Sequence, residues 1–258
     1  LAKENKKIRA LNSVAKKAAE KSRKASLAAT AKKLIQEVNS ASAKVNALLL
    51  AESEKYLEQN KIVGVIGGDH SVPFSNIAAH LKKYPEMGIL HFDAHFDLRK
   101  AYEGFTHSHA SIFYNCITQL PLKKLTQVGI RDYCEEELEF AQSNENKISY
   151  FLDSEIFERK ARGENFQSIT RAIVETLPQE VYISFDIDGL DPALCPGTGT
   201  PVPGGLQFQE AIYIFRQVVS SGRKIIGFDL CEVGAEEYDG NIGARILFEL
   251  CNLSLLSR

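Results

Sequence analysis

Six short apolar runs rich in β-branched residues alternate with longer amphipathic stretches along most of this 258-residue chain. Runs of this length predict buried strands, and the stretches between them carry apolar residues three and four positions apart, as helices do. The runs are KIVGVIGG (61–68), MGILHFD (87–93), LTQVGIRD (125–132), KISYFLD (147–153), EVYISFDID (180–188) and RKIIGFDLCE (223–232), and the helical stretches include 134–142, 155–176, 206–221 and 240–254. The alternation predicts βαβ units, that is, an α/β fold with a buried, mostly parallel sheet and helices on both faces.

The charges of the chain are nearly balanced, with 31 basic and 33 acidic residues and a net charge of -2. This balance argues against a general polyanion binder, so we expect no nucleic-acid partner. Residues 1–33 are an exception, because they hold 11 Lys or Arg residues against only Glu4 and Glu20. We interpret this segment as the solvated face of a Lys/Ala-rich helix, with anion binding as the alternative.

The cysteines show neither a disulfide framework nor a zinc finger, because they are odd in number, scattered and without C-x-x-C spacing. They are Cys116, Cys134, Cys195, Cys231 and Cys251. No apolar run approaches the roughly 18–20 residues that span a bilayer, and no signal-peptide apolar segment follows the basic start. We therefore expect a reducing, cytoplasmic location and no membrane partner.

Polar residues gather where four of the predicted strands end, in GGDHS, HFDAHFD, SFDIDGLDP and DLCE. In open α/β sheets, ligands bind outside the carboxyl ends of the strands. Clusters from four βα junctions of one sheet can therefore converge on a single site.

The spacing within these clusters predicts a metal centre. If the chain stays extended, residues two apart point to one side of a strand, and two of the clusters repeat Asp or His at this interval. The candidate ligands are His70, Asp93, His95, Asp97, Asp186 and Asp188. Six imidazole and carboxylate ligands are too many for one tetrahedral zinc site and suit two divalent ions, which would also relieve the repulsion among four carboxylates. The absence of thiolates favours manganese, with iron, cobalt or nickel as alternatives.

Other polar residues have simpler interpretations. Asp69 and Asp191 are typical of helix caps or turns, and His80 and His91 of ordinary core positions. PGTGTPVPGG (196–205) lacks the Lys-Ser/Thr of a P-loop and the strand-to-helix context of a dinucleotide site. We expect it to form a rigid turn that supports the Asp186 strand end.

These motifs, with SHAS (108–111), resemble the series found in the arginase/agmatinase/formimidoylglutamase (ureohydrolase) family over about the last three quarters of the chain. The resemblance implies an arginase-like three-layer α/β/α sandwich, two Mn²⁺ per chain held by the same six residues, and hydrolysis of a guanidino or formimino C–N bond. It also implies a homo-oligomer, trimeric or hexameric. The family normally opens with a β-strand, whereas this sequence opens in helical residues. We therefore expect a single domain over residues 1–258 without that strand, and its sheet neighbour would be an exposed edge.

The resemblance assigns roles to three further features. Two ions would activate a water that attacks the amidine carbon, and Asp97 would carry a proton to the leaving amine. His109 matches the proton shuttle of the family, with His107 as the alternative. Glu232 matches the acidic residue that grips the cationic amidine end of the substrate.

The substrate is predicted from two positions. With Arg99, the motif DAHFDLR resembles that of formimidoylglutamase more than that of arginase or agmatinase, and Arg99 would pair with a carboxylate of glutamate. A structural salt bridge explains the presence of Arg99 equally well. Cys134 stands where arginases carry an acidic residue, which disfavours arginase activity. We expect formimidoylglutamate as substrate, cleaved to glutamate and formamide. Agmatine, another guanidino compound, or a catalytically silent metal-binding relative are the alternatives, and a single-zinc deacetylase would leave Asp97 and Asp188 surplus.

Overall fold

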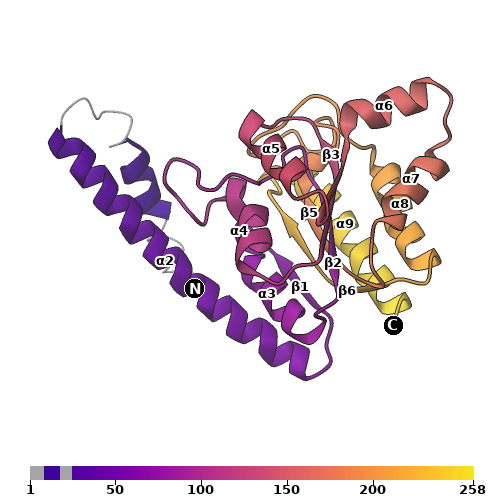
Figure 1. The fold of residues 1–258 in the computed structure, drawn as a ribbon, viewed down its shortest axis with the longest axis horizontal. Helices are drawn as coiled ribbons and strands as arrows, with labels where there is room; N and C mark the ends of the chain where they lie inside the picture. Colours follow the sequence, from indigo (N-terminus) through magenta and orange to yellow (C-terminus); the bar gives the residue numbers. More distant parts are fainter. Residues whose placement is uncertain (1–8, 18–24) are drawn as a thin grey trace.

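A parallel β-sheet lies at the centre of the computed structural model, which describes residues 9–17 and 25–258 (Figure 1). Its six strands are β1 (Val63–Ile66), β2 (Gly88–Phe92), β3 (Lys124–Ile130), β4 (Ile148–Leu152), β5 (Glu180–Asp186) and β6 (Lys224–Cys231). They lie in the order β1-β6-β5-β2-β3-β4, and every neighbouring pair is parallel. All six predicted strand runs and the α/β fold are confirmed.

Helices cover both faces of the sheet and complete the three layers (Figure 1). One face packs against α3 (Phe74–Lys83), α4 (Ile112–Gln119) and α5 (Glu135–Ser143), and the other packs against α6 (Asp153–Ala161), α7 (Phe166–Glu175), α8 (Phe208–Ser220) and α9 (Glu237–Leu256). The prediction of one continuous helical stretch over 155–176 was wrong. The chain leaves the helical conformation between α6 and α7, where Gly163 adopts a φ of 86° that favours glycine.

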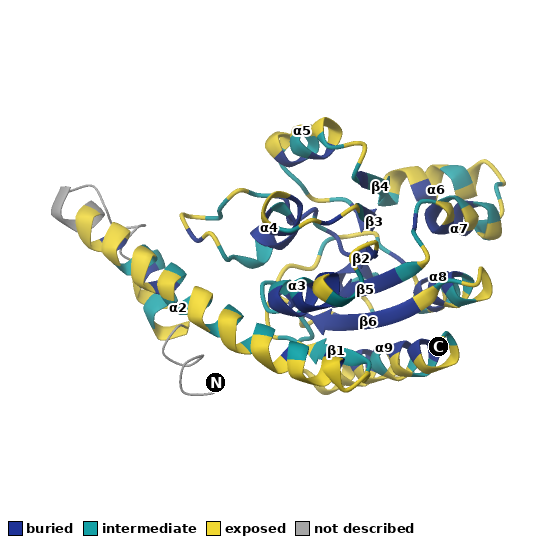
Figure 2. Ribbon diagram, turned by 60° about the horizontal axis from the view of Figure 1, so that its bottom comes forward, coloured by how far each residue is buried: buried dark blue, intermediate teal, exposed yellow. Residues whose placement is uncertain are grey.

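The apolar core consists of two main clusters, one on each face of the sheet. Phe92 and Phe185 point to the α7–α9 side, where both rings meet Phe215 at centroid distances of 5.2 and 5.6 Å. Their neighbours Ile89 and Tyr182 belong to the cluster on the α3–α4 side. Because both faces are covered, the central strands are buried along their length (Figure 2), which explains why their sequences are almost continuously apolar.

The N-terminal part of the described chain lies beside the sheet rather than within it. The long helix α2 (Ala25–Glu58) packs its C-terminal half on α3, and its other end extends away from the sheet (Figure 1). Residues 9–17 form a helix that is held to α2 and to the loop before α4 by a small cluster around Ala15, Val38 and Phe105. This helix therefore lies near the carboxyl edge of the sheet.

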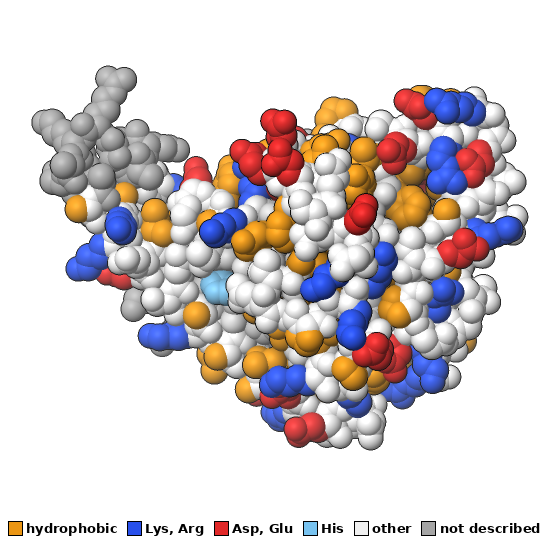
Figure 3. All heavy atoms as spheres, viewed as in Figure 1, with side chains coloured by type: hydrophobic (Ala, Val, Ile, Leu, Met, Phe, Trp, Pro, Cys, Tyr) orange, Lys and Arg blue, Asp and Glu red, His pale blue; other side chains and the backbone are white. Residues whose placement is uncertain are grey.

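The surface prediction for residues 1–33 concerns in part residues 1–8 and 18–24, which lie outside the described residues. Of its described cations, Arg9, Lys17, Lys32 and Lys33 are exposed. Basic and acidic side chains are interspersed over the face shown in Figure 3.

β1 forms one edge of the sheet among the described residues, and its Ile66 is 64% exposed. No helix of the described segments is long and apolar enough to cross a bilayer.

Candidate metal centre

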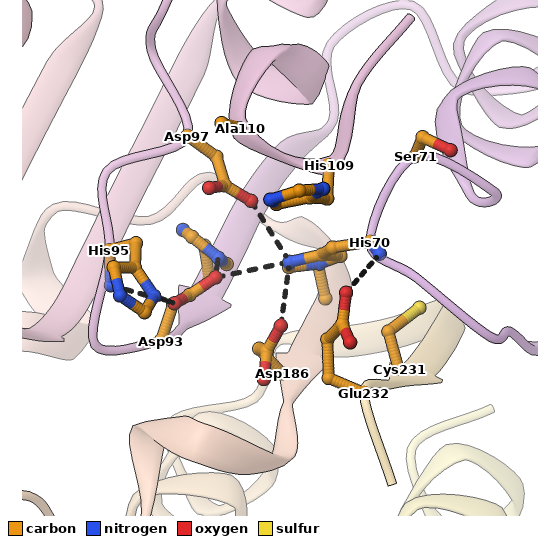
Figure 4. A network of polar contacts seen from close by, with 12 residues as sticks. His70, Ser71, Asp93, His95, Asp97, His109, Ala110, Asp186, Cys231 and Glu232 are labelled. Carbon is orange, nitrogen blue, oxygen red and sulfur yellow. Dashed lines mark hydrogen bonds and ion pairs between the residues drawn. The ribbon is translucent and has the colours of Figure 1, made fainter. Parts of the chain in front are cut away.

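Polar side chains from four strand ends meet at the carboxyl edge of the sheet (Figure 4). His70 follows β1, Asp93 follows β2, Asp186 ends β5 and Glu232 follows β6. These four strands are neighbours in the sheet order, so their ends lie together. This is the edge at which open α/β sheets bind ligands.

The first group of donor atoms surrounds the imidazole of His70. Its Nδ1 lies 3.0 Å from Oδ2 of Asp93, 3.3 Å from Oδ2 of Asp97 and 3.3 Å from Oδ2 of Asp186. All four residues are buried. Three carboxylate oxygens thus surround one ring nitrogen, Nδ1 of His70.

The second group surrounds His95. Its Nδ1 lies 3.2 Å from Oδ1 of Asp93 and 3.2 Å from Oδ2 of Asp188. Asp93 therefore belongs to both groups, with Oδ2 in the first and Oδ1 in the second. The six predicted ligands form two adjacent clusters joined by one carboxylate.

The backbone brings these residues together by turns rather than by extended strand. β2 ends at Phe92, and Oδ1 of Asp93 accepts a hydrogen bond from the backbone N–H of His95 at 2.7 Å. In the same way, Oδ1 of Asp186 accepts from the N–H of Asp188 at 2.9 Å, where a 3₁₀ turn follows β5. The expectation that 91–97 stays extended was wrong, because an Asp side chain can cap the N–H two residues ahead and so turns the chain.

The donor set fits divalent ions. Nitrogen and oxygen ligands about 2.1 Å from one ion lie about 3 Å apart when they meet at right angles, and the nitrogen–oxygen separations given above are close to that value. In the second group, donor atoms of Asp93, His95 and Asp188 all lie within 4.8 Å of one another. Burial raises the pKa of Asp186 well above 3.8, and the neighbouring charges of Asp188 and Asp93 raise it further. Burial and the charge of Asp93 likewise raise the pKa of Asp97 to about 7. A cation would stabilise the charged form of each carboxylate, which the fold alone disfavours.

The pKa values of the two imidazoles are raised as well, so that these rings favour their charged form. Burial lowers the pKa of His95, but hydrogen bonds to Asp188 and Asp93 outweigh it and raise that pKa to about 12. Burial lowers the pKa of His70 as well, and its bonds to Asp186, Asp93 and Asp97 raise it well above 6.5. Without a metal, protons on these rings are the nearest counter-charges for the carboxylates.

Two buried residues that the sequence analysis did not assign to the site also contact it. His91 was placed in the core, where it does lie, and its Nε2 is 2.9 Å from Oδ2 of Asp93. Asp229 lies behind His70, with Oδ1 3.7 Å from Nε2 of that ring, and Ser184 Oγ lies between them at 3.0 Å from Asp229 Oδ1 and 2.9 Å from His70 Nε2. The sequence signal for Asp229 was its charge, because a carboxylate inside the apolar run KIIGFDL needs a partner.

The two candidate shuttle histidines occupy different surroundings. His109 lines the cavity that also exposes His95 and Asp97, and it begins a 3₁₀ turn before α4. His107 is turned toward α2, where its Nδ1 lies 3.3 Å from Nδ2 of Asn46. The geometry therefore favours His109 for contact with the centre (Figure 4).

The remaining predicted site residues lie at the rim. Oε1 of Glu232 accepts a hydrogen bond from the backbone N–H of His70 at 3.0 Å, and burial raises the pKa of this carboxyl to about 7. Arg99 lines the same cavity as His95, yet its Nε also lies 3.3 Å from Oε2 of Glu137. Both interpretations of Arg99, a cavity residue and a salt bridge, therefore have a structural basis.

Two of the proposed catalytic residues adopt the left-handed backbone region. The φ of Asp97 is 54° and that of Glu232 is 59°, conformations that favour glycine. Residues held in such conformations cluster at functional sites, where the surrounding structure maintains them.

The Pro/Gly-rich loop after the Asp188 turn is fixed by one arginine. Arg131 donates to the carbonyls of Asp188 and Val202 at 2.7 and 3.0 Å, and Oγ1 of Thr200 donates to Oδ2 of Asp188 at 3.3 Å. These hydrogen bonds connect the loop to the turn at Asp188, and its rigidity stays a prediction. Asp69 and Asp191 act as turn formers, because each accepts from the N–H two residues ahead.

The model of the arginase family matches residues 6–253 of the chain. The chain belongs to the arginase family. Among relatives of this family, N(1)-aminopropylagmatine ureohydrolase of Thermus thermophilus is 35% identical over 187 residues, which cover 72% of this chain and 59% of that protein. Agmatinase of Bacillus subtilis is 33% identical over 201 residues, 76% of this chain and 65% of that protein. The chain thus spans slightly less than two thirds of the length of these arginase-family relatives.

Solved structures of the arginase family share the fold. A putative agmatinase from Clostridium difficile superposes with a TM-score of 0.69 at 29% identity, covering 81% of this chain and 73% of that one. Proclavaminate amidino hydrolase from Streptomyces clavuligerus gives a TM-score of 0.71 at 27% identity, covering 83% of this chain and 71% of that one. The three-layer sandwich is therefore the arginase-family fold.

Proposed function

We propose that the chain hydrolyses a C–N bond of a linear amidine or guanidino compound and that it does so with two divalent metal ions, Mn²⁺ being the first candidate. The observation that carries this proposal is the buried carboxylate of Asp93, which joins two groups of nitrogen and oxygen donors. A cavity of about 150 Å³ opens beside them, lined by His95, Asp97 and His109. Membership of the arginase family supports the same chemistry.

Each donor group would hold one ion. His70, Asp93, Asp97 and Asp186 would bind the first, and Asp93, His95 and Asp188 the second. When bound, the pair of ions would supply an acidified water as nucleophile near neutral pH.

The protein side chains would orient the substrate and move protons. Glu232 keeps one carboxylate oxygen on the backbone of His70, and the planar N–H groups of an amidine are suitable donors to the other. Asp97 faces the cavity and would pass a proton to the leaving amine. His109 lines the same cavity and would exchange that proton with solvent.

The substrate has two candidates. Arg99 at the cavity supports formimidoylglutamate, although none of the relatives described above is named for it. Those relatives are named for agmatine or aminopropylagmatine, so an agmatine-like guanidino substrate fits about equally.

The test is a substrate panel with manganese-loaded protein. Formamide release from formimidoylglutamate and urea release from agmatine, arginine and 4-guanidinobutyrate are measured together with the metal content of each chain. Turnover of at least one compound, with two ions per chain, is expected. Light scattering of the same preparation tests the trimer or hexamer implied by the family.

Matched variants separate the site from the rest of the fold. Asp97→Asn is expected to abolish turnover, whereas Glu158→Gln, on exposed helix α6 and ion-paired only with Arg162 among the described residues, is expected to retain it. Folded, metal-loaded protein that hydrolyses no member of the panel would contradict the proposed function and favour a silent relative.

A further inference from the structure

Two cavities flank the metal centre and share one wall. Tyr102 and His109 line both. The first, already described, contains Asp97 and Asp132, and we call it the Asp132 cavity. The second lies between helix 9–17, α2 and the loops that carry Gly68 and Tyr102, and we call it the N-terminal cavity.

The N-terminal cavity lies beside the metal centre. Gly68, Asp69 and Ser71, which flank His70, form part of its wall together with His109. Its volume is about 140 Å³, roughly ten times the space that one water molecule needs on the same measure. A substrate whose amidine lies at Glu232 therefore has room to extend its other end here.

The basic side chains of this cavity come from helix 9–17. Lys16 is occupied, because its Nζ lies 3.5 Å from Oε2 of Glu103. Arg9 has no carboxylate within ion-pair distance in the part of the chain that the structure describes. Its guanidinium lies against the loop before His70, with Nη2 3.2 Å from the position that a Cβ on Gly68 would take. A larger residue at Gly68 would press on this contact.

One acidic side chain, Asp69, also lines the cavity, and its hydrogen bonds with Ser71 hold it in the loop without removing its charge. Oδ1 of Asp69 accepts hydrogen bonds from the backbone N–H and the hydroxyl of Ser71. Asn12 also lines the cavity, and its Oδ1 is buried without a partner among the described residues. Among the described residues, the cavity thus offers one guanidinium without a carboxylate partner, whereas the free Asn12 oxygen is an acceptor and does not bind a carboxylate.

The Asp132 cavity has the opposite character. Its cation, Arg99, is neutralised by Glu137 at 3.3 Å, and Asp97 belongs to the metal centre. Asp132 remains, 66% exposed and 3.7 Å from the imidazole of His95. An ammonium end would suit this side, whereas a carboxylate end suits the guanidinium of Arg9, which has no carboxylate partner in the described part of the chain.

We infer that the N-terminal cavity is a subsite for the distal end of the substrate, that this end carries a carboxylate, and that Arg9 binds it. The inference rests on the proposed function, which it narrows to amidines or guanidino compounds with an acidic tail.

Two guanidino compounds test the inference, because they differ chiefly in the charge of the distal end. 4-Guanidinobutyrate ends in a carboxylate and agmatine in an ammonium group. The manganese-loaded full chain is expected to show the higher kcat/KM on 4-guanidinobutyrate. Loss of one charge-assisted contact in Arg9→Gln is expected to shift the ratio of the two kcat/KM values toward agmatine by on the order of tenfold to a hundredfold, mainly through KM for the acid.

Lys17→Gln is the matched control, because it removes the same charge from the same helix at an exposed position that does not line the cavity. It is expected to leave the ratio unchanged. A wild-type preference for agmatine, or an equal ratio in wild type and Arg9→Gln, overturns the inference and leaves the proposed function intact.

A binding measurement decides the inference even if wild type turns over neither compound and the proposed function fails. Calorimetric titration of 4-guanidinobutyrate into metal-loaded wild type, Arg9→Gln and Lys17→Gln then reports the subsite alone. Weakened binding in Arg9→Gln only supports the subsite, and equal affinities, or no binding to wild type, overturn it.

Discussion

The shared carboxylate of Asp93 leads to an unequal prediction for two substitutions in the metal centre. Asp93 contributes one oxygen to each donor group, whereas Asp188 contributes only to the group around His95. Asp93→Asn should therefore weaken the binding of both ions, and Asp188→Asn should weaken the binding of one.

The size of the effect can be worked out for the stability that metal binding adds. At a free metal concentration 100 times Kd, each site adds about 2.7 kcal/mol, and two sites add about 5 kcal/mol. At roughly 2–4 °C per kcal/mol for a chain of about this size, the metal should raise Tm by about 10–20 °C. A hundredfold to tenfold weaker site adds only about 0.4–1.4 kcal/mol at the same metal concentration. Asp93→Asn should thus lose about half to five sixths of the rise, and Asp188→Asn about a quarter to two fifths.

The assay is calorimetric or fluorescence-detected unfolding with and without Mn²⁺, with elemental analysis of each chain. Only the metal-induced rise is compared, because removing a carboxylate also changes the metal-free protein. Asp191→Asn is the control, since Asp191 forms a turn outside both donor groups and Asn preserves that turn. Equal losses of metal and of Tm in Asp93→Asn and Asp188→Asn would refute the two-group arrangement.

Three further predictions follow from single contacts. Asp229→Asn should weaken metal binding about tenfold to a hundredfold, because Asp229 lies behind the His70 ring and orients it through Ser184. Equilibrium dialysis measures the affinity, and an undiminished value would contradict this role. Gly205→Ala should destabilise the fold by on the order of 1–3 kcal/mol, because the φ of Gly205 is 98° and the new Cβ would lie 2.7 Å from the Leu190 carbonyl. Urea unfolding measures the change, and an unchanged free energy of unfolding would show that the loop can relax. Burial lowers the pKa of His80 to about 4, below its unfolded value of about 6.5, so the stability that neutral His80 contributes is present above pH 6.5 and is lost as the pH falls toward 4. His80→Gln should reduce the change in the free energy of unfolding over this pH range by about 3 kcal/mol. An identical pH dependence of stability in both proteins would contradict this.

The fold was predictable because its strongest signal is repeated. The central strands are buried on both faces, so each appears as a continuous apolar run, and the helices between the strands keep their own period. The break between α6 and α7 was missed because one glycine at a positive φ ends a helix without changing the apolar spacing on either side.

The position of the centre was also predictable, since polar residues at strand ends meet wherever the strands are neighbours. The manner of their convergence was not. A two-residue interval is consistent both with strand alternation and with an Asp that caps the N–H two residues ahead, and only the local hydrogen bonds of Asp93 and Asp186 distinguish the two. His91 and Asp229 were missed for a related reason, because inside a buried strand no spacing rule separates a core residue from one that contacts a ligand.

The backbone at Asp97 and Glu232 connects the fold with the proposed chemistry. Elsewhere among the described residues, most positions with positive φ are glycine, as at Gly204 and Gly205, since glycine adopts this region without steric cost, and the further exceptions are Asn60 and Glu103. At Asp97 and Glu232 the chain has carboxylates instead, and hydrogen bonds hold the backbone of each residue. Two N–H groups of α4 donate to the Asp97 carbonyl, and the Glu232 N–H donates to the Gly68 carbonyl. Packing alone does not require a charged side chain at either position. The strain is accounted for if both carboxylates must face the centre, which is what the proposed roles in proton transfer and amidine binding demand.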